Sequence, residues 1–526
     1  MSCAYYNKRS ELHKVYKDSQ QDIDNSMFVL SSALNAVHCT NHGNRYWNII
    51  IRSWLEYIVE NFHHHKMMSD NCNYLHSKQL SFHVANGFLD FERQVCTIEW
   101  KDELSVLIGF LNNNNNINGS DLLKSDISYQ VISNSIYKKT MLIFLFFIKK
   151  IVPENRIIST TIFSPSLFLS CIFKLHLLPV PAIYVRDIST TTINPEMREK
   201  LYRSGEFNAK GVLSDTLWKL VCATIPLSYL EDYHRLVNHS YQKYGKPTRI
   251  VLSHNLHSPD SYKVWIANSV ENNTKLVGVQ HGGGFGIVFY DYLEVHETDI
   301  SDIYLSWFSS TNQKNIQVPS PKKIQWNRKV GRKSVVLVNV AYPSFYKYLS
   351  CPIMEQTIQN IDDQIVFLKL LDRSVIPCMS VRQYPHNYDL PIQDKYKDSG
   401  LINLVDKESS YNKLISTANL IVLSYMGTTW LEALMSNIPT IVFVNPDHWD
   451  MKQEIYPYLD KLKNVGILHD TPISAANHIN NIFPDIDAWW NNLSLQLVRE
   501  EFCQNFAYTE KKWAEKWTNA IQTILD

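Results

Sequence analysis

A glycine-rich run after a short apolar strand is the first feature of this sequence that could do chemistry. The predicted strand Lys275–Val279 leads directly into Gln280 and His281. Four of the next five residues are glycines: Gly282, Gly283, Gly284 and Gly286. Glycine costs conformational entropy and is retained where the backbone takes positive φ or approaches a ligand. A tight turn that needs glycine for geometry alone is the alternative, but the polar pair favours a site, with His281 as the candidate catalytic base and Gln280 beside it as a binding residue.

A second stretch has the pattern of a buried strand, a turn and a helix that begins at two threonines. Leu420–Leu423 is the continuous apolar run typical of a parallel strand covered on both faces. The residues expected to cradle a phosphate at the helix N-terminus are Ser424, Gly427, Thr428 and Thr429. Free backbone N–H groups and the helix dipole favour an anion there, and Glu432, one turn inside, is placed to accept from a ribose. Ordinary N-capping is the alternative.

Other charged residues are candidates on weaker grounds. Arg382 follows a short predicted strand and is expected to bind a diphosphate or a sugar carboxylate in the bidentate way that arginine favours, with a surface salt bridge as the alternative. Lys263, Glu297 and Asp302 are weaker catalytic candidates, because charged residues on helices and loops are usually solvated.

A metal site is not expected. The run His63–His65 cannot converge on one ion from a helix face, so we interpret it as a solvated loop. Because no Asp-x-Asp motif follows a strand, the sequence predicts chemistry that requires no metal.

Composition indicates a folded protein without a dominant charge. Of the 526 residues, 45% are hydrophobic and 19% charged, and Lys+Arg and Asp+Glu both number 51, so no global field recruits nucleic acid or an anionic membrane. The nine cysteines include no CxxC pair, which favours reduced thiols in the cytoplasm.

The polar start predicts no signal peptide. The strongest apolar run, Met141–Ile148, is far short of the ~20 residues that span a bilayer, so we expect at most peripheral contact with the inner membrane.

Periodicity divides the chain into four parts. Residues 1–150 are mainly helical, with helices over 27–61 separated by a turn at Thr40–Asn44. Residues 151–320 alternate strands and helices, as in a Rossmann-like domain. The strands are expected at Ile157–Phe163, Arg249–Ser253 and Lys275–Val279, and the helices at Ser166–Leu175, Leu213–Val237 with a break near Pro226, and Asp260–Asn272. Residues 309–333 are polar and proline-containing and are the predicted linker.

The same pattern restarts over residues 330–480. The expected strands are Ser334–Asn339, Met379–Arg382, Leu401–Val405, Leu420–Leu423 and Ile438–Val444, and the expected helices are Glu355–Leu371 and Ser409–Ala418. Residues 481–526 are a helical C-terminal segment. The predicted class is α/β, with two Rossmann-like domains that face a cleft, as in the GT-B architecture of nucleotide-sugar glycosyltransferases.

Several motifs together resemble a known family. They are Leu34-Asn35, His38, Arg45–Ile50, Ile225–Leu230, Asp260–Ala267, Gln280–Gly286, His296–Trp307, Gly427–Glu432 and Asn437–Ile441. Each piece is weak, but the combination is similar to the transferase family found in bacterial O-antigen and surface-carbohydrate gene clusters, with a more distant likeness to retaining Kdo transferases, which use CMP-activated donors. The opening Met1–Asp24 departs from the family pattern, in which a strand and a Trp-Cys segment are usual.

The resemblance implies a glycosyltransferase that moves a sugar from a nucleotide-activated donor to a growing surface polysaccharide. It implies no cofactor beyond the donor itself, a lipid-linked or polysaccharide acceptor, and no nucleic-acid partner. Two alternatives stay open. A nucleotide-sugar epimerase of the same architecture shares the phosphate-binding features, and a non-catalytic subunit of a polysaccharide assembly complex needs binding alone.

Overall fold

The computed structural model describes most of the chain, in segments. They are residues 13–69, 81–94, 98–113, 117, 121–125, 155–159, 164–182, 191–254, 256, 259–322, 333–342, 354–384, 390–406 and 417–526. The described residues form two compact units. One contains Gln280–Val295 and Leu305–Ala520, and the other contains His13–Val279, His296–Tyr304 and Ile521–Asp526. We call them the C-terminal unit and the N-terminal unit.

The C-terminal unit is built on a six-stranded parallel sheet. Its strand order is β11-β10-β9-β12-β13-β14. The strands are β9 (Val335–Val338), β10 (Met379–Arg382), β11 (Val405–Asp406), β12 (Leu420–Leu423), β13 (Thr440–Phe443) and β14 (Leu468–His469). Every residue of β9, β12 and β13 is buried, as expected for parallel strands with both faces covered.

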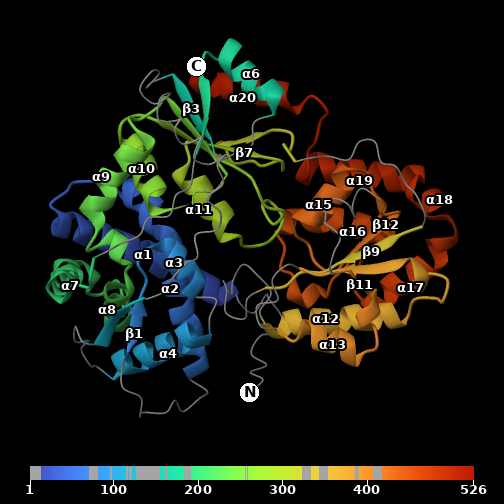
Figure 1. Cartoon of the computed structure of the whole chain (residues 1–526), viewed down its shortest axis with the longest axis horizontal. Helices are drawn as coiled ribbons and strands as arrows, with labels where there is room; N and C mark the ends of the chain where they lie inside the picture. The colour runs from blue at the N-terminus through green and yellow to red at the C-terminus, as the bar shows by residue number, and fades with distance from the viewer. Residues whose placement is uncertain are drawn as a thin grey trace. The chain divides into compact units, whose positions relative to one another are not determined.

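Helices cover both faces of this sheet. In Figure 1, α12, α13 and α17 lie on one side and α15, α16 and α19 on the other. Their bounds are α12 (Met354–Lys369), α13 (Ile392–Asp398), α15 (Thr428–Met435), α16 (Tyr456–Asn464), α17 (Pro472–Ile482) and α19 (Leu493–Phe506). Two further helices complete this part of the chain: α18 (Ile486–Trp490) precedes α19, and α20 (Trp513–Leu525) follows it. On the α12 side, the sheet forms an apolar core with buried residues of α12, α13, α17 and α18.

The strand order reverses at β9. The chain runs from β9 outward through β10 to β11 and then returns to β12 on the opposite side of β9. The connection that leaves β9 therefore runs toward β10, and the connection that leaves β12 runs in the opposite direction, toward β13. Open α/β sheets bind ligands at the carboxyl ends of strands at such a reversal, so this edge is where a site is expected.

The second six-stranded sheet has the order β4-β3-β5-β6-β7-β8. Its strands are β3 (Arg156–Ser159), β4 (Leu178–Pro181), β5 (Ile250–Ser253), β6 (Lys275–Val279), β7 (Ile303–Ser306) and β8 (Asn315–Gln317). The pairs β3–β4, β3–β5 and β5–β6 are parallel. The division into units passes through β7, so β8 belongs to the C-terminal unit.

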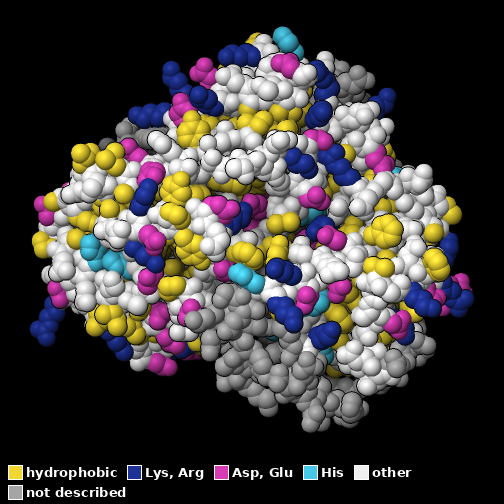
Figure 2. Space-filling view, turned by 180° about the vertical axis from the view of Figure 1, so that it is seen from behind, with side chains coloured by type: hydrophobic (Ala, Val, Ile, Leu, Met, Phe, Trp, Pro, Cys, Tyr) yellow, Lys and Arg dark blue, Asp and Glu magenta, His cyan; other side chains and the backbone are white. Residues whose placement is uncertain are grey.

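Helices make up most of the rest of the N-terminal unit. They are α1 (His13–His38), α2 (Asn44–Ser69), α3 (Phe88–Gln94), α4 (Ile98–Asn112), α6 (Pro165–Phe173), α7 (Pro195–Ala209), α8 (Asp215–Thr224), α9 (Tyr233–Tyr244), α10 (Asp260–Glu271) and α11 (Tyr292–Ile300), which begins in the C-terminal unit. A two-stranded parallel sheet, β1 (Phe82–Val84) with β2 (Leu122–Lys124), accompanies α4. Both signs of charge are interspersed over the face that Figure 2 shows, consistent with the equal numbers of basic and acidic residues.

The α/β class predicted from the sequence is confirmed, and several boundaries agree. The predicted strands Lys275–Val279, Met379–Arg382 and Leu420–Leu423 are β6, β10 and β12. The break near Pro226 is also confirmed, because α8 ends at Thr224 and a 3-10 turn follows the proline. The predicted helix Ser409–Ala418 lies almost entirely outside the described residues, as does the apolar run Met141–Ile148.

Two predicted elements are wrong. Leu401–Val405 is mainly a 3-10 turn, because only two residues of this edge pair with β10. His63–His65 is not a loop: it lies in α2, where His63 contacts Asp22 at 2.9 Å and His65 is buried against the helical core.

The predicted linker 309–333 is packed over its described part. Residues 309–322 contain β8, Ser309 N–H donates to Asn505 O, and Trp517 Nε1 donates to Pro319 O. This segment is therefore held by the C-terminal helices, because they meet its backbone hydrogen-bonding groups.

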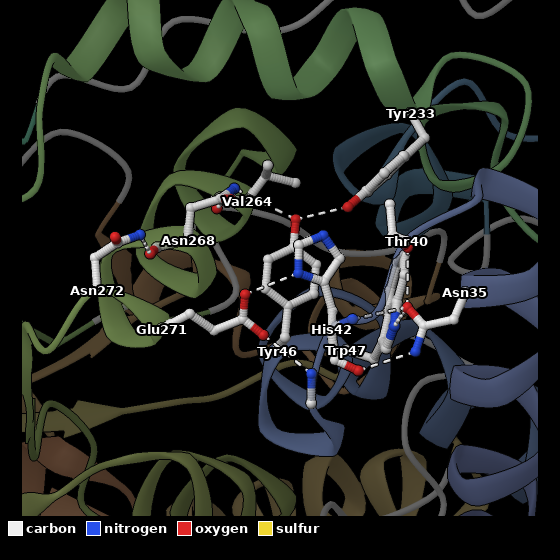
Figure 3. Close-up of polar contacts among 11 residues, drawn as sticks. Asn35, Thr40, His42, Tyr46, Trp47, Tyr233, Val264, Asn268, Glu271 and Asn272 are labelled. Carbon is white, nitrogen blue, oxygen red and sulfur yellow. Dashed lines mark hydrogen bonds and ion pairs between the residues drawn. The ribbon is translucent and has the colours of Figure 1, made fainter.

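The turn between α1 and α2 carries a connected cluster of polar and aromatic side chains (Figure 3). Asn35 Oδ1 accepts from Thr40 Oγ1, His42 N–H and Trp47 Nε1, at 2.9–3.1 Å. His42 stacks on Tyr46 with ring centroids 3.7 Å apart and pairs with Glu271 of α10 at 2.8 Å. We call this cluster the α1–α2 corner; it contains the Asn35 and Arg45–Ile50 motifs of the family resemblance.

Candidate functional site

Three hydrogen-bond donors lie without a described partner at the carboxyl ends of β9 and β10. They are Asn339 Nδ2, Arg382 Nε and Gln383 Nε2, each buried and unpaired among the residues that the structure describes. Asn339 is 1% exposed, and its other side-chain atom, Oδ1, accepts from Tyr384 N–H at 3.3 Å. Arg382 Nη1 donates to Gln383 O at 2.6 Å, which fixes the guanidinium beside the strand end. Buried polar groups are nearly always hydrogen-bonded, so this cluster offers donors to a ligand that accepts.

The N-terminus of α15 contributes further donors at the end of β12. Gly427 is its N-cap, and no side chain caps this helix end. Thr429 Oγ1 accepts from Tyr425 OH at 2.7 Å, and burial raises the pKa of Tyr425 to about 12, which keeps the phenol protonated. The first-turn N–H groups of α15 and the helix dipole favour a negative charge.

The register of the sheet brings these donors close together. Val338 at the end of β9 pairs with Arg382 on one side and with Leu423 on the other. Adjacent strands are roughly 4.8 Å apart, so Arg382, Asn339 and the turn after β12 follow one another along the edge. We call them the donor edge.

The glycine loop packs on the same helix end. Gly283 N–H donates to Thr428 Oγ1 at 3.0 Å. A Cβ at Gly283 would lie 2.5 Å from the backbone of Gly427 and Thr428. Glycine is therefore required here for close contact between two backbone segments, and the Thr428 hydroxyl, as an acceptor for this bond, keeps its own proton for a ligand.

The remaining loop residues differ in their surroundings. A Cβ at Gly282 meets nothing closer than 3.5 Å, whereas one at Gly284 would lie 2.9 Å from Asp291 Oδ2. Gly286 has φ +75° and lies against the Phe308 ring, so it needs glycine for conformation. His281 is half-buried beside Phe285, with ring centroids 5.1 Å apart.

Two residues predicted to bind the substrate hold the structure instead. Gln280 is 1% exposed; its Oε1 accepts from Trp307 N–H and its Nε2 donates to Gly282 O. The Ser424 hydroxyl is fully buried and bonds to Asn360 and Gln364 of α12. Both predictions are corrected for the same reason: the buried side chains of Gln280 and Ser424 are hydrogen-bonded within the protein, so they are not available to a substrate.

Between these elements lies a small cavity. Its walls include Val340 after β9, Asn360 on α12, Tyr425 after β12 and Asn445 after β13, and its volume is about 10 Å³. That is room for roughly one water. Asn339, Arg382 and Gln383 do not line this cavity. Glu432, half-buried on α15, lies 3.8 Å from Lys322 Nζ.

The weaker catalytic candidates all lie in the N-terminal unit, where each has a structural partner. Lys263 is fully buried, donates to Tyr229 OH at 2.5 Å and lies 3.3 Å from Asp260; burial lowers its pKa. Contrary to the expectation of solvation, this lysine is inside the core.

The carboxylates of Glu297 and Asp302 are likewise bonded to other residues of the N-terminal unit. Glu297 is fully buried and accepts from Tyr304 OH at 3.2 Å. Asp302 pairs with Arg45 at 2.9 Å and accepts from Leu276 N–H. We find no ligand-facing role for either group or for Lys263.

Asn339 and Gln383 were not among the residues predicted from the sequence. Asn339 was only the last residue of a predicted strand, and Gln383 followed Arg382. A polar residue that directly follows an apolar parallel strand is the available signal, since it lies at the edge where ligands bind.

No cluster of three His, Cys, Asp or Glu side chains that could hold a metal ion occurs within the described segments. The expectation of metal-independent chemistry stays a prediction. None of the described helices is both long and apolar enough to cross a membrane.

The comparison with family models gives one assignment for nearly the whole chain. The model described as LIC12162 family transferase matches residues 3–521. The expected resemblance to a transferase family is thus confirmed. No curated protein matches the chain.

Solved structures with similar folds are distant in sequence. A Staphylococcus aureus MnaA–UDP complex has a TM-score of 0.38 at 10% identity, covering 70% of this chain and 97% of that one. The wall teichoic acid polymerase TagF, with CDPG, has a TM-score of 0.33 at 9% identity, covering 76% and 98%. The glycosyltransferase SnogD from Streptomyces nogalater has a TM-score of 0.34 at 10% identity, covering 70% and 98%. At these scores the likenesses add no argument about the site.

Proposed function

We propose, from the premise that the chain belongs to the LIC12162 family of transferases, that it is a glycosyltransferase with a nucleotide-sugar donor. The acceptor we infer is a growing bacterial surface polysaccharide of the O-antigen or capsule type, lipid-linked or free. The enzyme would act in the cytoplasm and reach a membrane-borne acceptor by peripheral contact. The observation that carries the proposal is the donor edge.

The donor edge suits a diphosphate. Three nitrogen atoms of the donor edge can donate hydrogen bonds, and none of them has a partner among the described residues. They are Asn339 Nδ2, Arg382 Nε and Gln383 Nε2. The uncapped N-terminus of α15 adds backbone donors and a favourable dipole. These groups would stabilise the charge that develops on the nucleotide phosphate as the bond between the anomeric carbon and the phosphate oxygen breaks.

The acceptor hydroxyl must lose a proton as its oxygen bonds to the anomeric carbon. We assign this proton to the His281 imidazole, which can accept it near neutral pH. His281 lies in the loop that carries Gly283, and Gly283 packs on α15. The base and the phosphate-binding helix therefore belong to one compact unit. Glu432 would bind the ribose.

The test is equilibrium binding of CMP-, UDP-, GDP- and dTDP-sugars to the full chain and to Arg382→Ala and Gln383→Ala. Loss of a hydrogen bond to a charged group costs about 1.5–3 kcal/mol, so the affinity for the cognate donor should fall at least tenfold. Arg203→Ala is the matched control, because Arg203 is exposed and pairs only with Glu199 in the described structure. Equal affinity in all variants would refute the donor edge as the nucleotide site.

Turnover separates the transferase from its alternatives. A transferase releases nucleotide only when an acceptor is present and becomes glycosylated. An epimerase converts the donor sugar without an acceptor, and a binding subunit does neither. His281→Asn should lower the transfer rate by about 10²–10⁴ while nucleotide affinity persists; transfer at the wild-type rate would show that His281 is not the base.

A further inference from the structure

A second pocket, unused by the proposed reaction, lies beside the edge strand β14. Its volume is about 450 Å³, within the range of ligand pockets. It is framed by the end of α16, by β14, by the first turns of α17 and by α18; these helices lie together at the right of Figure 1. We call it the edge pocket, and its principal lining side chains are Lys463, Asn464, Asp470, Ser474, His478 and Trp489.

The edge pocket carries no net charge near neutral pH. Lys463 Nζ pairs with Asp470 at 2.9 Å. Burial lowers the pKa of His469 to about 4 and lowers the pKa of His478 as well, so both imidazoles are neutral. A pocket of this kind does not select a phosphate or a carboxylate, which distinguishes it from the donor edge.

Its polar groups suit hydroxyls. His469 Nε2 lies 3.1 Å from Gly466 O and must donate to it, so Nδ1 accepts from Ser474 Oγ at 2.8 Å. His478 Nε2 is buried and has no partner in the described part of the chain. Because a hydroxyl both donates and accepts, it can pair with this nitrogen in either tautomer of the ring.

Two backbone features fix the walls. Gly466 has φ +79°, and a Cβ there would lie 2.6 Å from the His478 ring, so the ring packs directly on the backbone. Trp489 Nε1 donates to Val465 O at 3.1 Å, and its ring meets His478 edge to face at 5.2 Å. The half-buried indole therefore presents a preorganised apolar surface to the pocket.

We propose that the edge pocket is a second carbohydrate-binding site, which takes neutral sugar units of the acceptor glycan. The C–H face of a sugar ring packs on Trp489, and its hydroxyls bond to His478, Ser474 and the Lys463–Asp470 pair. That the glycan is the acceptor rests on the proposed function. β14 lies three strands from β9, roughly 14 Å away, so the pocket binds units several residues from the reacting end.

The test uses the full chain and neutral linear tetrasaccharides of glucose, galactose, mannose, rhamnose and N-acetylglucosamine as probes, with binding measured by titration calorimetry and by saturation-transfer NMR. Ser474→Trp fills the pocket from an exposed position in the first turn of α17. Ser494→Trp is the matched control, because Ser494 is equally an exposed serine in the first turn of α19 and lines no part of the pocket. We expect at least tenfold weaker tetrasaccharide binding for Ser474→Trp and none of this loss for Ser494→Trp.

His478→Phe is the second variant. Because His478 Nε2 has no described partner, its removal should leave the melting temperature nearly unchanged but weaken tetrasaccharide binding at least tenfold. The inference is overturned if no tetrasaccharide binds at millimolar concentration, or if both pocket variants bind like the wild type.

Nucleotide-sugar binding to the same variants distinguishes the two proposals. Donor binding with pocket-independent glycan binding would overturn the edge pocket alone. Pocket-dependent glycan binding without any donor binding would overturn the proposed function alone and leave a carbohydrate-binding site.

Discussion

The α1–α2 corner and the donor edge are both rich in polar side chains, yet they differ in where those side chains find partners. In the corner, one amide, Asn35, serves three donors, and Tyr46 OH and Tyr233 OH are 2.7 Å apart (Figure 3). At the donor edge, Asn339 leaves its Nδ2 unpaired within the described structure. The first arrangement joins helices, and the second leaves hydrogen-bonding capacity for a ligand.

The comparison shows that a polar motif in the sequence does not by itself indicate a site. Arg45 pairs with Asp302 and donates to Ile300 O, and Lys263 is enclosed by Tyr229 and Asp260. Such groups stabilise the fold because their burial is matched by hydrogen bonds. A site is indicated where the matching is incomplete.

The largest effect is expected from Asn35→Ala in the corner. This change removes the acceptor of Trp47 Nε1, and Trp47 is fully buried. It also removes the bonds to Thr40 and His42. Because each stranded buried donor costs about 1–3 kcal/mol, the free energy of unfolding in urea should fall by about 3 kcal/mol while nucleotide-sugar affinity stays the same.

Ser32→Ala, at an exposed position of the same helix, is the control and should change stability by less than about 0.5 kcal/mol. A loss of nucleotide affinity in a still-folded Asn35→Ala protein would break the comparison, because it would give the corner a role in binding.

A smaller effect, on both stability and binding, is expected from Gly283→Ala. The new methyl group would overlap the backbone of Gly427 and Thr428, and such overpacking costs about 1–3 kcal/mol. Urea unfolding should show the loss, and the affinity for the donor should fall at least tenfold as the loop moves away from α15.

Gly282→Ala is the matched control in the same loop, since its Cβ has room. If both variants have wild-type stability and affinity, the contact between the loop and α15 does not organise the donor edge.

The smallest effect is a pH dependence located in the corner region. His38 stacks on Tyr233 with centroids 4.3 Å apart, and burial lowers its pKa to about 4 from the usual 6.5. Between these values the unfolded chain binds a proton that the folded chain does not, so stability falls as the pH drops. From pH 7 to pH 5 this loss is about 2 kcal/mol.

His38→Gln should reduce this slope by that amount, as measured by urea unfolding at each pH, whereas His234→Gln at the exposed neighbouring ring should not. Parallel curves for wild type and His38→Gln would show that the buried imidazole does not control the dependence.

The sequence by itself determined the elements that carry the donor edge. Apolar runs bounded by polar residues define β6 and β12, because a strand buried on both faces has no alternation and ends where polarity returns. In β10 the apolar Met379 and Val381 alternate with Ser380 and Arg382, and only the two apolar residues are buried. The sequence also indicated that Arg382 ends a strand and that a helix begins at Thr428. The prediction of a strand at Leu401–Val405 was wrong, because an edge strand in which only two residues pair leaves no recognisable pattern in the sequence.

The tertiary structure alone decided which polar groups are satisfied. Ser424 and Asn339 both follow apolar strands, yet the first meets Asn360 and Gln364 from α12 while the Nδ2 of the second meets no described partner. It also brought Gly283 against Thr428, which is 145 positions away along the chain. Local propensity and hydrophobic period specify elements. The partner of a buried polar atom is set by side chains distant in sequence, so only the packed structure shows which donors remain for a ligand.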